Sequence, residues 1–330
     1  MTIISYFIEN KVKKIHIITL FDKNYLIRAL TMKESILYFY QNIQFWFLCL
    51  DTESKNMIEE IKMDMVKAIT LDNIGDERLL KTKIHRNNAE FAFTAKSVLI
   101  DYIINSSEVK ESEVVMWVDS DILFYSSPVD ILNEMEKYSI AITPHKFPDK
   151  NIELEKKVGR YNAGLIFFKV DNNSKKCINE WKNQCIDWCF LKYEDGKLGD
   201  QMYLDSWTKK YNAVYEIPDK GINLGSWNVE RYKVSSKSPE QIFIDNNPLV
   251  CYHFHGVKMY KDKENSVHFL PINIINKNIF DKYSKKIKET WKLVLLFDKK
   301  WAYGFIEKPS FVRLLKQKIY RNFQKINSYD

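Results

Sequence analysis

The chain has 330 residues, of which 45% are hydrophobic, 14% aromatic and 28% charged, with 9 glycines and 8 prolines. This is the composition of a globular protein, and it excludes a chain dominated by disorder. The 50 lysines and arginines exceed the 43 acids to give a net charge of +7, which favours phosphorylated ligands or anionic lipid but is too small to indicate nucleic acid. Five cysteines in a long chain, an odd number, fit a reducing cytoplasm.

The first half alternates short apolar runs with segments of helical periodicity, which predicts an α/β fold with a mostly parallel central sheet flanked by helices. The expected strands are Ile15–Phe21, Phe45–Asp51, Val66–Asp72 and Val114–Asp119. The expected helices are Tyr25–Tyr40, Thr52–Met63 and Ala89–Ile104. In such sheets ligands bind at the carboxyl ends of the strands, where five acids fall: Asp22, Asp51, Asp72, Asp119 and Asp121.

The second half has a mixed pattern. Its expected strands are Ile140–Thr143, Leu165–Val170, Val214–Ile217 and Leu249–Phe254, and its expected helices are Ser174–Phe190 and Gln201–Lys209. No internal repeat or low-complexity linker interrupts the pattern, so we expect one domain over residues 1–275 and a basic helical extension over residues 276–330. No apolar run reaches the roughly 18 to 20 residues of a membrane span, and the start lacks the charge pattern of a signal peptide, so a cytoplasmic location is expected.

Three cysteines raise the alternative of a metal site: Cys177, Cys185 and Cys189. Residues on one face of the expected helix recur at spacings of three and four: Cys177, Trp181, Cys185 and Trp188. We expect core packing, because zinc would need a fourth ligand. The tryptophans at 181, 188 and 207 are expected in the core as well.

The stretch VVMWVDSDILFYSSP, residues 114–128, carries an apolar strand directly into Asp119 and Asp121. Burying charge costs several kcal/mol unless the charge is paired, hydrogen-bonded or bound to a metal. At the rim of a sheet the two carboxylates are spaced to hold a divalent cation that bridges phosphate oxygens. The alternative is a turn in which both acids accept hydrogen bonds from backbone amides. This stretch alone leaves both interpretations open.

Four further stretches favour the cation. They are TLFDKNYLIRAL at residues 19–30, RYNAGLIFF at 160–168, GDQMYLDSW at 199–207 and CYHFHGVK at 251–258. Together with VDSDILFYSSP they resemble the GT-A glycosyltransferases, and among these the glycogenin-like retaining enzymes of family eight and bacterial transferases related to them. The resemblance spans roughly Ile15 to Lys258. It implies a GT-A fold, a nucleotide-sugar donor and a bound Mn²⁺ or Mg²⁺.

The resemblance also assigns residues. Asp119, Asp121 and His253 match the metal ligands. Residues matched to the nucleotide and its phosphates are Thr19, Asp22, Asn24, Tyr25, Lys96, Ser120, Gly256 and Lys258. Asn162, Ala163 and Gly164 match the sugar pocket, and Asp200 and Gln201 match the catalytic pair beside the anomeric carbon. Lys258 departs from the family spacing after Gly256, so His255 or Lys261 is a candidate to share its role.

Two aromatic side chains outside these motifs are also candidates for the acceptor side. Trp227 is placed to stack on a sugar ring, and we group it with His255 as substrate-binding. His145 in ITPHKF is either structural or faces the acceptor. If the enzyme inverts instead of retaining configuration, Asp200 becomes the candidate general base.

The predicted activity is metal-dependent transfer of a sugar, with a UDP-sugar favoured as donor, to a glycan or lipid-linked acceptor in bacterial surface polysaccharide or lipopolysaccharide synthesis, with retention. One alternative is a non-catalytic carbohydrate-binding protein of the same fold. Another is a sugar nucleotidyltransferase, but such enzymes carry a glycine-rich loop after the first strand, and TLFDKNY lacks it.

The segment FVRLLKQKIYRNFQKI, Phe311 to Ile326, predicts an amphipathic helix with one apolar and one basic face. Such a helix binds the anionic inner surface of a membrane, packs on its own domain or forms a homodimer. The sequence leaves these alternatives open.

Overall fold

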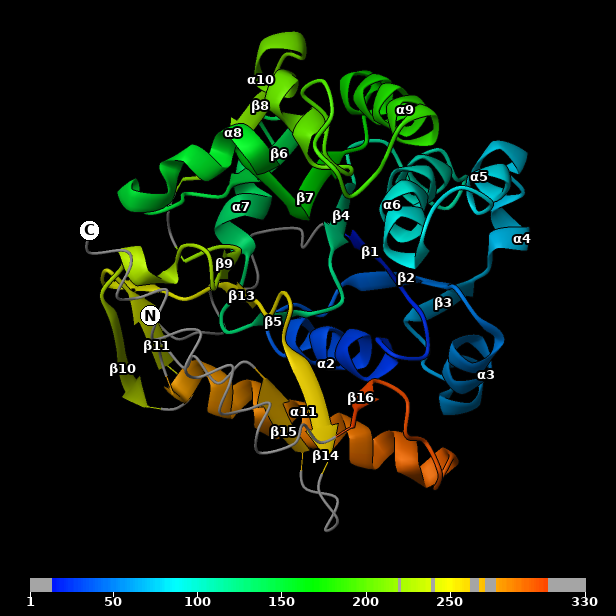
Figure 1. The fold of residues 1–330 in the computed structure, drawn as a ribbon, viewed down its shortest axis with the longest axis vertical. Coiled ribbons are helices and arrows are strands. Elements are labelled where there is room, and N and C mark those ends of the chain that lie inside the picture. Colours follow the sequence, from blue (N-terminus) through cyan, green and yellow to red (C-terminus); the bar gives the residue numbers. More distant parts are fainter. Residues whose placement is uncertain (1–13, 219–220, 239–240, 262–266, 271–276, 308–330) are drawn as a thin grey trace.

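The computed structural model describes residues 14–218, 221–238, 241–261, 267–270 and 277–307. Its centre is a sheet of seven strands in the order β3-β2-β1-β4-β7-β6-β8 (Figure 1). These strands are β1 (Ile15–Phe21), β2 (Ile43–Cys49), β3 (Val66–Ile69), β4 (Val114–Val118), β6 (Ile140–Pro144), β7 (Tyr161–Lys169) and β8 (Val214–Glu216). Neighbours are parallel except for β7, which runs antiparallel to β4 and β6. The predicted mostly parallel sheet is confirmed.

The two faces of this sheet belong to two separate hydrophobic cores. On β1, Ile15 and Ile17 lie in one core and Ile18 lies in the other, as the alternation of side chains along a strand requires. The longer helices that contribute to the first core are α2 (Leu26–Leu37), α3 (Thr52–Ile61) and α11 (Lys277–Phe297), and those that contribute to the second are α6 (Asn88–Ile104) and α9 (Asn172–Asp187). Figure 1 shows α2 and α11 on the side of the sheet away from α6 and α9.

Each element expected in the first half is present, and β1 has the predicted bounds. The strand expected at Val66–Asp72 ends early, at Ile69. Thr70 caps the short helix α4 (Leu71–Ile74) by forming a reciprocal capping box with Asn73. The prediction that Asp72 lies at the end of a strand is therefore wrong, because this acid occupies the first turn of a helix.

In the second half the structure corrects several boundaries. The strand expected at Leu165–Val170 is β7, which begins earlier, at Tyr161, so Asn162, Ala163 and Gly164 lie within the strand. The segment expected as a helix at Gln201–Lys209 is a 3-10 helix, η2 (Met202–Ser206), followed by α10 (Trp207–Lys210). The strand expected at Leu249–Phe254 is only β13 (Cys251–His253). The helix expected to reach Phe190 ends at Asp187 because Trp188 has extended backbone angles.

The remaining described elements are short. The helices are α5 (Glu77–Thr82), α7 (Val129–Glu134), η1 (Asp149–Leu154), α8 (Glu155–Val158) and η3 (Val229–Arg231). Within the described residues, three small sheets contain β5 (Ile122–Phe124), β13 and β9 (Leu224–Gly225); β10 (Val234–Ser238), β11 (Gln241–Ile244) and β12 (Asn247–Pro248); and β14 (Lys258–Lys261), β15 (Val267–Leu270) and β16 (Phe305–Ile306).

The cysteines considered as metal ligands lie in the second core. The side chains of Cys177, Cys185 and Cys189 are fully buried. Of the tryptophans expected beside them, Trp181 and Trp207 are buried and contact each other edge to face at 5.3 Å. Trp188 is only half-buried, because it follows the end of α9, and its Nε1 donates to Glu194 Oε1 at 3.2 Å. Its prediction as a core residue is wrong.

The helix α11 packs against the domain. Its buried residues include Tyr283 and Trp291, which belong to the same core as α2. Thr31 Oγ1 of α2 lies 2.9 Å from Thr290 Oγ1 and accepts from it, because the Thr31 proton goes to the Ile27 carbonyl. The amphipathic helix predicted at residues 311–326 lies outside the described residues. Among the helices that the structure describes, none is long and apolar enough to cross a bilayer.

Candidate functional site

Strand pairing places His253 beside the two acids. β4 is buried along its whole length and leads directly into Asp119 and Asp121. β5 follows and pairs antiparallel with β13, so that Ile122 lies opposite His253. The carbonyl of Asp121 accepts a hydrogen bond from the backbone N–H of Phe254 at 2.9 Å. Two segments far apart in the sequence therefore meet at one edge of the sheet.

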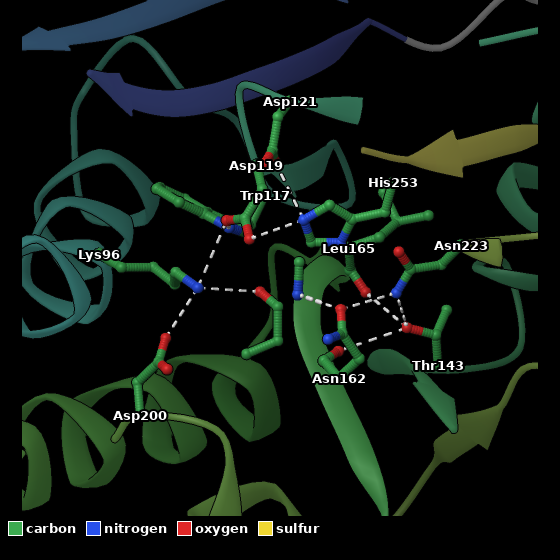
Figure 2. A network of polar contacts seen from close by, with 12 residues as sticks. Lys96, Trp117, Asp119, Asp121, Thr143, Asn162, Leu165, Asp200, Asn223 and His253 are labelled. Atoms are coloured by element: carbon green, nitrogen blue, oxygen red, sulfur yellow. Dashed lines mark hydrogen bonds and ion pairs between the residues drawn. The ribbon is translucent and has the colours of Figure 1, made fainter. Parts of the chain in front are cut away.

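The three predicted metal ligands lie close together (Figure 2). His253 Nε2 is 3.0 Å from Asp121 Oδ1 and 3.7 Å from Asp119 Oδ2. Burial alone would raise the pKa of Asp121, but His253 holds it well below its usual value; burial would lower the pKa of His253, but Asp121 raises it. Asp119 is more exposed, and its Oδ1 accepts a hydrogen bond from Trp117 Nε1 at 2.7 Å.

Lys96 reaches the same edge from α6 and is only 3% exposed. Its Nζ lies 2.7 Å from Asp200 Oδ2 and 3.4 Å from Asp119 Oδ1, and it donates to the carbonyl of Ala163 at 3.1 Å (Figure 2). Burial would lower the pKa of this lysine, but the two carboxylates raise it well above its usual value. The lysine is therefore a fixed positive charge that joins Asp119 to Asp200.

The carboxamide of Asn162 is held by a buried polar network. Its Oδ1 accepts from the backbone N–H of Gly164 at 2.9 Å and from Asn223 Nδ2 at 3.0 Å, and its Nδ2 is 3.3 Å from His145 Nε2. Asn223 Nδ2 also donates to Thr143 Oγ1 at 2.7 Å (Figure 2). Sequence reasoning missed Asn223 and Thr143 as site residues. The sequence offered only a weak signal, an asparagine two positions after Gly221. In the structure Asn223 adopts a positive φ of 51°.

His145 is a buried, neutral member of this network. Its Nδ1 lies 2.9 Å from the carbonyl of Gly159, which can only accept, so Nδ1 carries the proton and Nε2 accepts from Asn162. Burial lowers the pKa of His145 to about 4. Both ring nitrogens are engaged within the protein, which favours the structural interpretation over contact with an acceptor.

Trp227 forms an aromatic wall beside the acids. A Cβ at Gly225 would lie 2.2 Å from the Trp227 ring, so only glycine lets the indole lie there. The ring contacts His253 edge to face at 5.4 Å and His255 at 6.5 Å. One ligand atom each from Asp121, His253 and His255 lies within 4.8 Å of the others. The structure thus places His255, predicted as substrate-binding, next to two predicted metal ligands.

The loop between β1 and α2 is largely organised by Asp22. Its Oδ1 accepts from the backbone N–H groups of Asn24 at 2.9 Å and of Tyr25 at 3.2 Å, and its Oδ2 accepts from Asn24 Nδ2 at 2.9 Å. The Arg28 guanidinium lies 4.4 Å from the centroid of the Tyr25 ring, which is 40% exposed. Thr19 is fully buried, and its Oγ1 has no hydrogen-bond partner among the described residues. The loop therefore presents the half-exposed Tyr25 ring to solvent, whereas both carboxylate oxygens of Asp22 accept hydrogen bonds from the loop itself.

A late segment of the chain closes over this loop, which the sequence did not predict. The backbone N–H of Gly304 donates to Asn24 Oδ1 at 3.3 Å, and a Cβ at this glycine would lie 2.5 Å from the Asn24 carbonyl. Lys23 Nζ lies 4.6 Å from the centroid of the Tyr303 ring. The segment is fixed because β16 pairs in parallel with β14.

Four further residues predicted for the site make no direct polar contact with the acidic pair among the contacts that the structure describes. Gln201 Nε2 donates to the carbonyl of Val158 at 2.8 Å rather than to a group at the acidic pair. Lys258 begins β14 with an exposed side chain, and Gly256 adopts a positive φ of 71° in open space. Ser120 is buried between the two acids. Within the described part of the chain, the structure does not join Gln201 or Lys258 to the acids by a polar contact.

Comparisons with known proteins identify sequence relatives and a fold shared with solved structures. No protein-family model matches the chain. It is 29% identical over 252 residues to the uncharacterized protein YfnF of Bacillus subtilis (strain 168), which covers 74% of this chain and 82% of that protein. It is 25% identical over 251 residues to the uncharacterized protein YfnD of the same organism, and this match covers 76% of this chain and 80% of that protein.

Among solved structures, the galactosyltransferase LgtC, in complex with donor and acceptor sugar analogues, superposes with a TM-score of 0.53 and 13% sequence identity. The match covers 84% of this chain and 95% of that chain. The predicted GT-A glycosyltransferase fold is confirmed.

Proposed function

We infer that this protein is a metal-dependent glycosyltransferase that uses a nucleotide-sugar donor. The observation that carries this inference is the meeting of Asp119, Asp121 and His253 at the carboxyl end of β4, beside the buried Lys96–Asp200 pair. In open α/β sheets this edge is where ligands bind. The fold neighbour LgtC, with its donor and acceptor sugar analogues, supports a site that holds both partners of a transfer reaction.

The donor set suits a divalent cation. Asp121 is a buried carboxylate that stays ionised, and its oxygen faces an imidazole nitrogen rather than an arginine or lysine. Carboxylate oxygens with one borderline nitrogen favour Mn²⁺ or Mg²⁺. When bound there, such an ion supplies positive charge against the diphosphate that leaves the sugar.

The chain's own residues would bind and orient the sugar. The Lys96 ammonium fixes Asp200 and Asp119 at the edge of the site, so that these carboxylates are available to accept hydrogen bonds from sugar hydroxyls. Asn162 keeps one N–H free of its network, and the absent side chain of Gly164 leaves room for close approach. In this proposal the nearby Gln201 turns from Val158 toward the anomeric carbon.

The finer proposal follows the resemblance in sequence. The favoured donor is a UDP-sugar, with the exposed Tyr25 ring placed for a base. The proposed acceptor is a glycan or a lipid-linked glycan of a bacterial surface polysaccharide, and the proposed stereochemistry is retention. Trp227 is proposed to bound the acceptor side, because its ring stands beside both histidines.

A thermal-shift panel tests the proposal. UDP, GDP, CMP and dTDP sugars are added with and without Mn²⁺ to the natural protein, to Asp121→Ala and to Asp72→Asn, an exposed acid on α4 that serves as control. A ligand at about 100 times its dissociation constant should stabilise the fold by about 2.7 kcal/mol. We expect one nucleotide family to stabilise the natural protein and the control only with metal, and Asp121→Ala to lose the effect.

Turnover is then measured as release of the nucleoside diphosphate from the stabilising donor, and NMR of the product sugar reports retention or inversion. Metal-dependent binding without any release would favour the non-catalytic alternative. No shift with any nucleotide would refute the donor site altogether.

A further inference from the structure

His255 lies beside the acidic pair because of how the residue before it packs. The Phe254 ring is 1% exposed and stacks on Tyr283 of α11, with ring centroids 3.7 Å apart and planes only 6° from parallel. Phe254 anchors this segment in the core, His253 ends β13, and His255 lies in the turn that follows; a ring nitrogen of each histidine comes within 4.8 Å of an Asp121 oxygen.

The geometry of the two histidines supports a shared ligand. One nitrogen from each ring and one oxygen of Asp121 lie within 4.8 Å of one another, a spacing compatible with a common ion. The two rings are 5.8 Å apart and nearly perpendicular, at 88°, and Trp227 contacts both of them. The side chain of His255 is exposed, so it can turn toward an ion without displacing buried neighbours.

Only one of the two carboxylate oxygens of Asp119 is open to a metal ion. Its Oδ1 already accepts from Trp117 and faces Lys96 at 3.4 Å. Only Oδ2, which lies 3.7 Å from His253 Nε2, faces the site. The atoms that cluster within 4.8 Å are therefore one Asp121 oxygen and two imidazole nitrogens, with Asp119 Oδ2 3.7 Å from the His253 Nε2.

We propose that His255 is a fourth protein ligand of the divalent cation and that it makes the site selective for a first-row transition ion such as Mn²⁺ over Mg²⁺. The proposal rests on the metal-dependent function proposed above, and it narrows the choice of ion from Mn²⁺ or Mg²⁺ to a transition ion such as Mn²⁺. Mg²⁺ takes oxygen ligands and keeps much of its water, whereas imidazole nitrogen favours transition ions. A second imidazole therefore shifts the preference of the site away from Mg²⁺ and toward transition ions, of which Mn²⁺ is the one tested.

The test measures metal binding directly, without turnover. Free Mn²⁺ is followed by EPR during titration of the natural protein, His255→Leu, His255→Gln and His85→Leu, whose exposed histidine lies outside the site, and Mg²⁺ affinity is obtained by competition. We expect both His255 variants to bind Mn²⁺ at least about tenfold more weakly, with Mg²⁺ affinity changed less than about threefold. Pulsed EPR should count two imidazole nitrogens on Mn²⁺ in the natural protein and one in each variant.

The outcomes separate this proposal from the proposed function. If Mn²⁺ binds and supports nucleotide binding, but the ratio of Mn²⁺ to Mg²⁺ affinity is the same in the His255 variants, His255 is no ligand and the proposed function stands. If the variants lose nucleotide affinity alone, His255 contacts phosphate and the proposal is overturned. If the natural protein binds no divalent ion, the proposed function fails as well. Circular dichroism and melting in EDTA confirm that each variant is folded.

Discussion

The buried Lys96 makes the sharpest prediction about stability. In Lys96→Met the hydrophobic stem is kept but the charge is removed, which leaves Asp200, itself 4% exposed, without its partner. At an effective dielectric constant of about 20, unit charges 2.7 Å apart attract by about 6 kcal/mol, and charges 3.4 Å apart by about 5 kcal/mol. Desolvation offsets much of this attraction. Breaking a buried pair from one side costs about 3 to 5 kcal/mol, and we expect that loss in Lys96→Met.

The assay is urea unfolding of four proteins: natural, Lys96→Met, Asp200→Asn and the double variant. Because the double variant removes both charges of the closest pair, it should be more stable than Lys96→Met, with a coupling energy of at least about 2 kcal/mol. Lys55→Met is the control, since Lys55 pairs with Glu59 at 3.1 Å on an exposed face of α3 and should lose less than about 1 kcal/mol.

Two results would refute this reasoning. The first is a loss below about 1 kcal/mol in Lys96→Met, which would mean that the lysine is solvated or uncharged. The second is strict additivity of the two single variants, which would mean that Lys96 and Asp200 do not interact. Either result would also remove the fixed charge that the proposed sugar pocket relies on.

Three further predictions concern glycines and a buried histidine. In Gly164→Ala the new Cβ would lie 2.6 Å from His253 Cε1, so Mn²⁺ affinity measured by EPR should fall at least about tenfold; unchanged affinity would contradict the geometry. In Gly304→Ala, at a φ of +86°, the Cβ would lie 2.5 Å from the Asn24 carbonyl, so calorimetry should show nucleotide binding weakened several-fold, and an unaltered dissociation constant would argue against contact. His145, with a pKa of about 4 when folded and 6.5 when unfolded, contributes stability above pH 6.5 that is lost as pH falls toward 4, by about 3 kcal/mol in all. Urea unfolding at pH 7 and pH 4.5 should show this slope flattened in His145→Gln, and a persisting slope would assign it elsewhere.

Elements whose signal is local were predictable from the sequence. β4 is a continuous apolar run, β1 is an apolar run interrupted only by His16 and Thr19, and the structure has both within a residue of the expected bounds. The end of β3 was missed because Thr70 forms its capping box with Asn73, so a helix begins where the apolar pattern suggested more strand. Local capping overrode the periodicity there.

The site residues also divide into those that a local sequence pattern predicts and those that depend on contacts between distant segments. Asp119 and Asp121 are visible as acids directly after a buried strand, and the resemblance supplied His253. Asn223 was not visible, because its role depends on contacts with Asn162 and Thr143 that join separate strands. No local sequence pattern predicts a contact between residues that lie so far apart in the chain.

The contact between Gly304 and Asn24 spans 280 residues. A ribosome adds about 5 to 20 residues per second, so the loop after β1 waits about 15 to 55 seconds between its own emergence and that of the segment that covers it. β14, which is made late in this interval, also lacks its neighbour β16 until the interval ends. The nascent chain therefore presents an unfinished loop after β1 throughout most of its synthesis, and binding of the proposed donor to polypeptides still on the ribosome should be weaker than binding to the released protein.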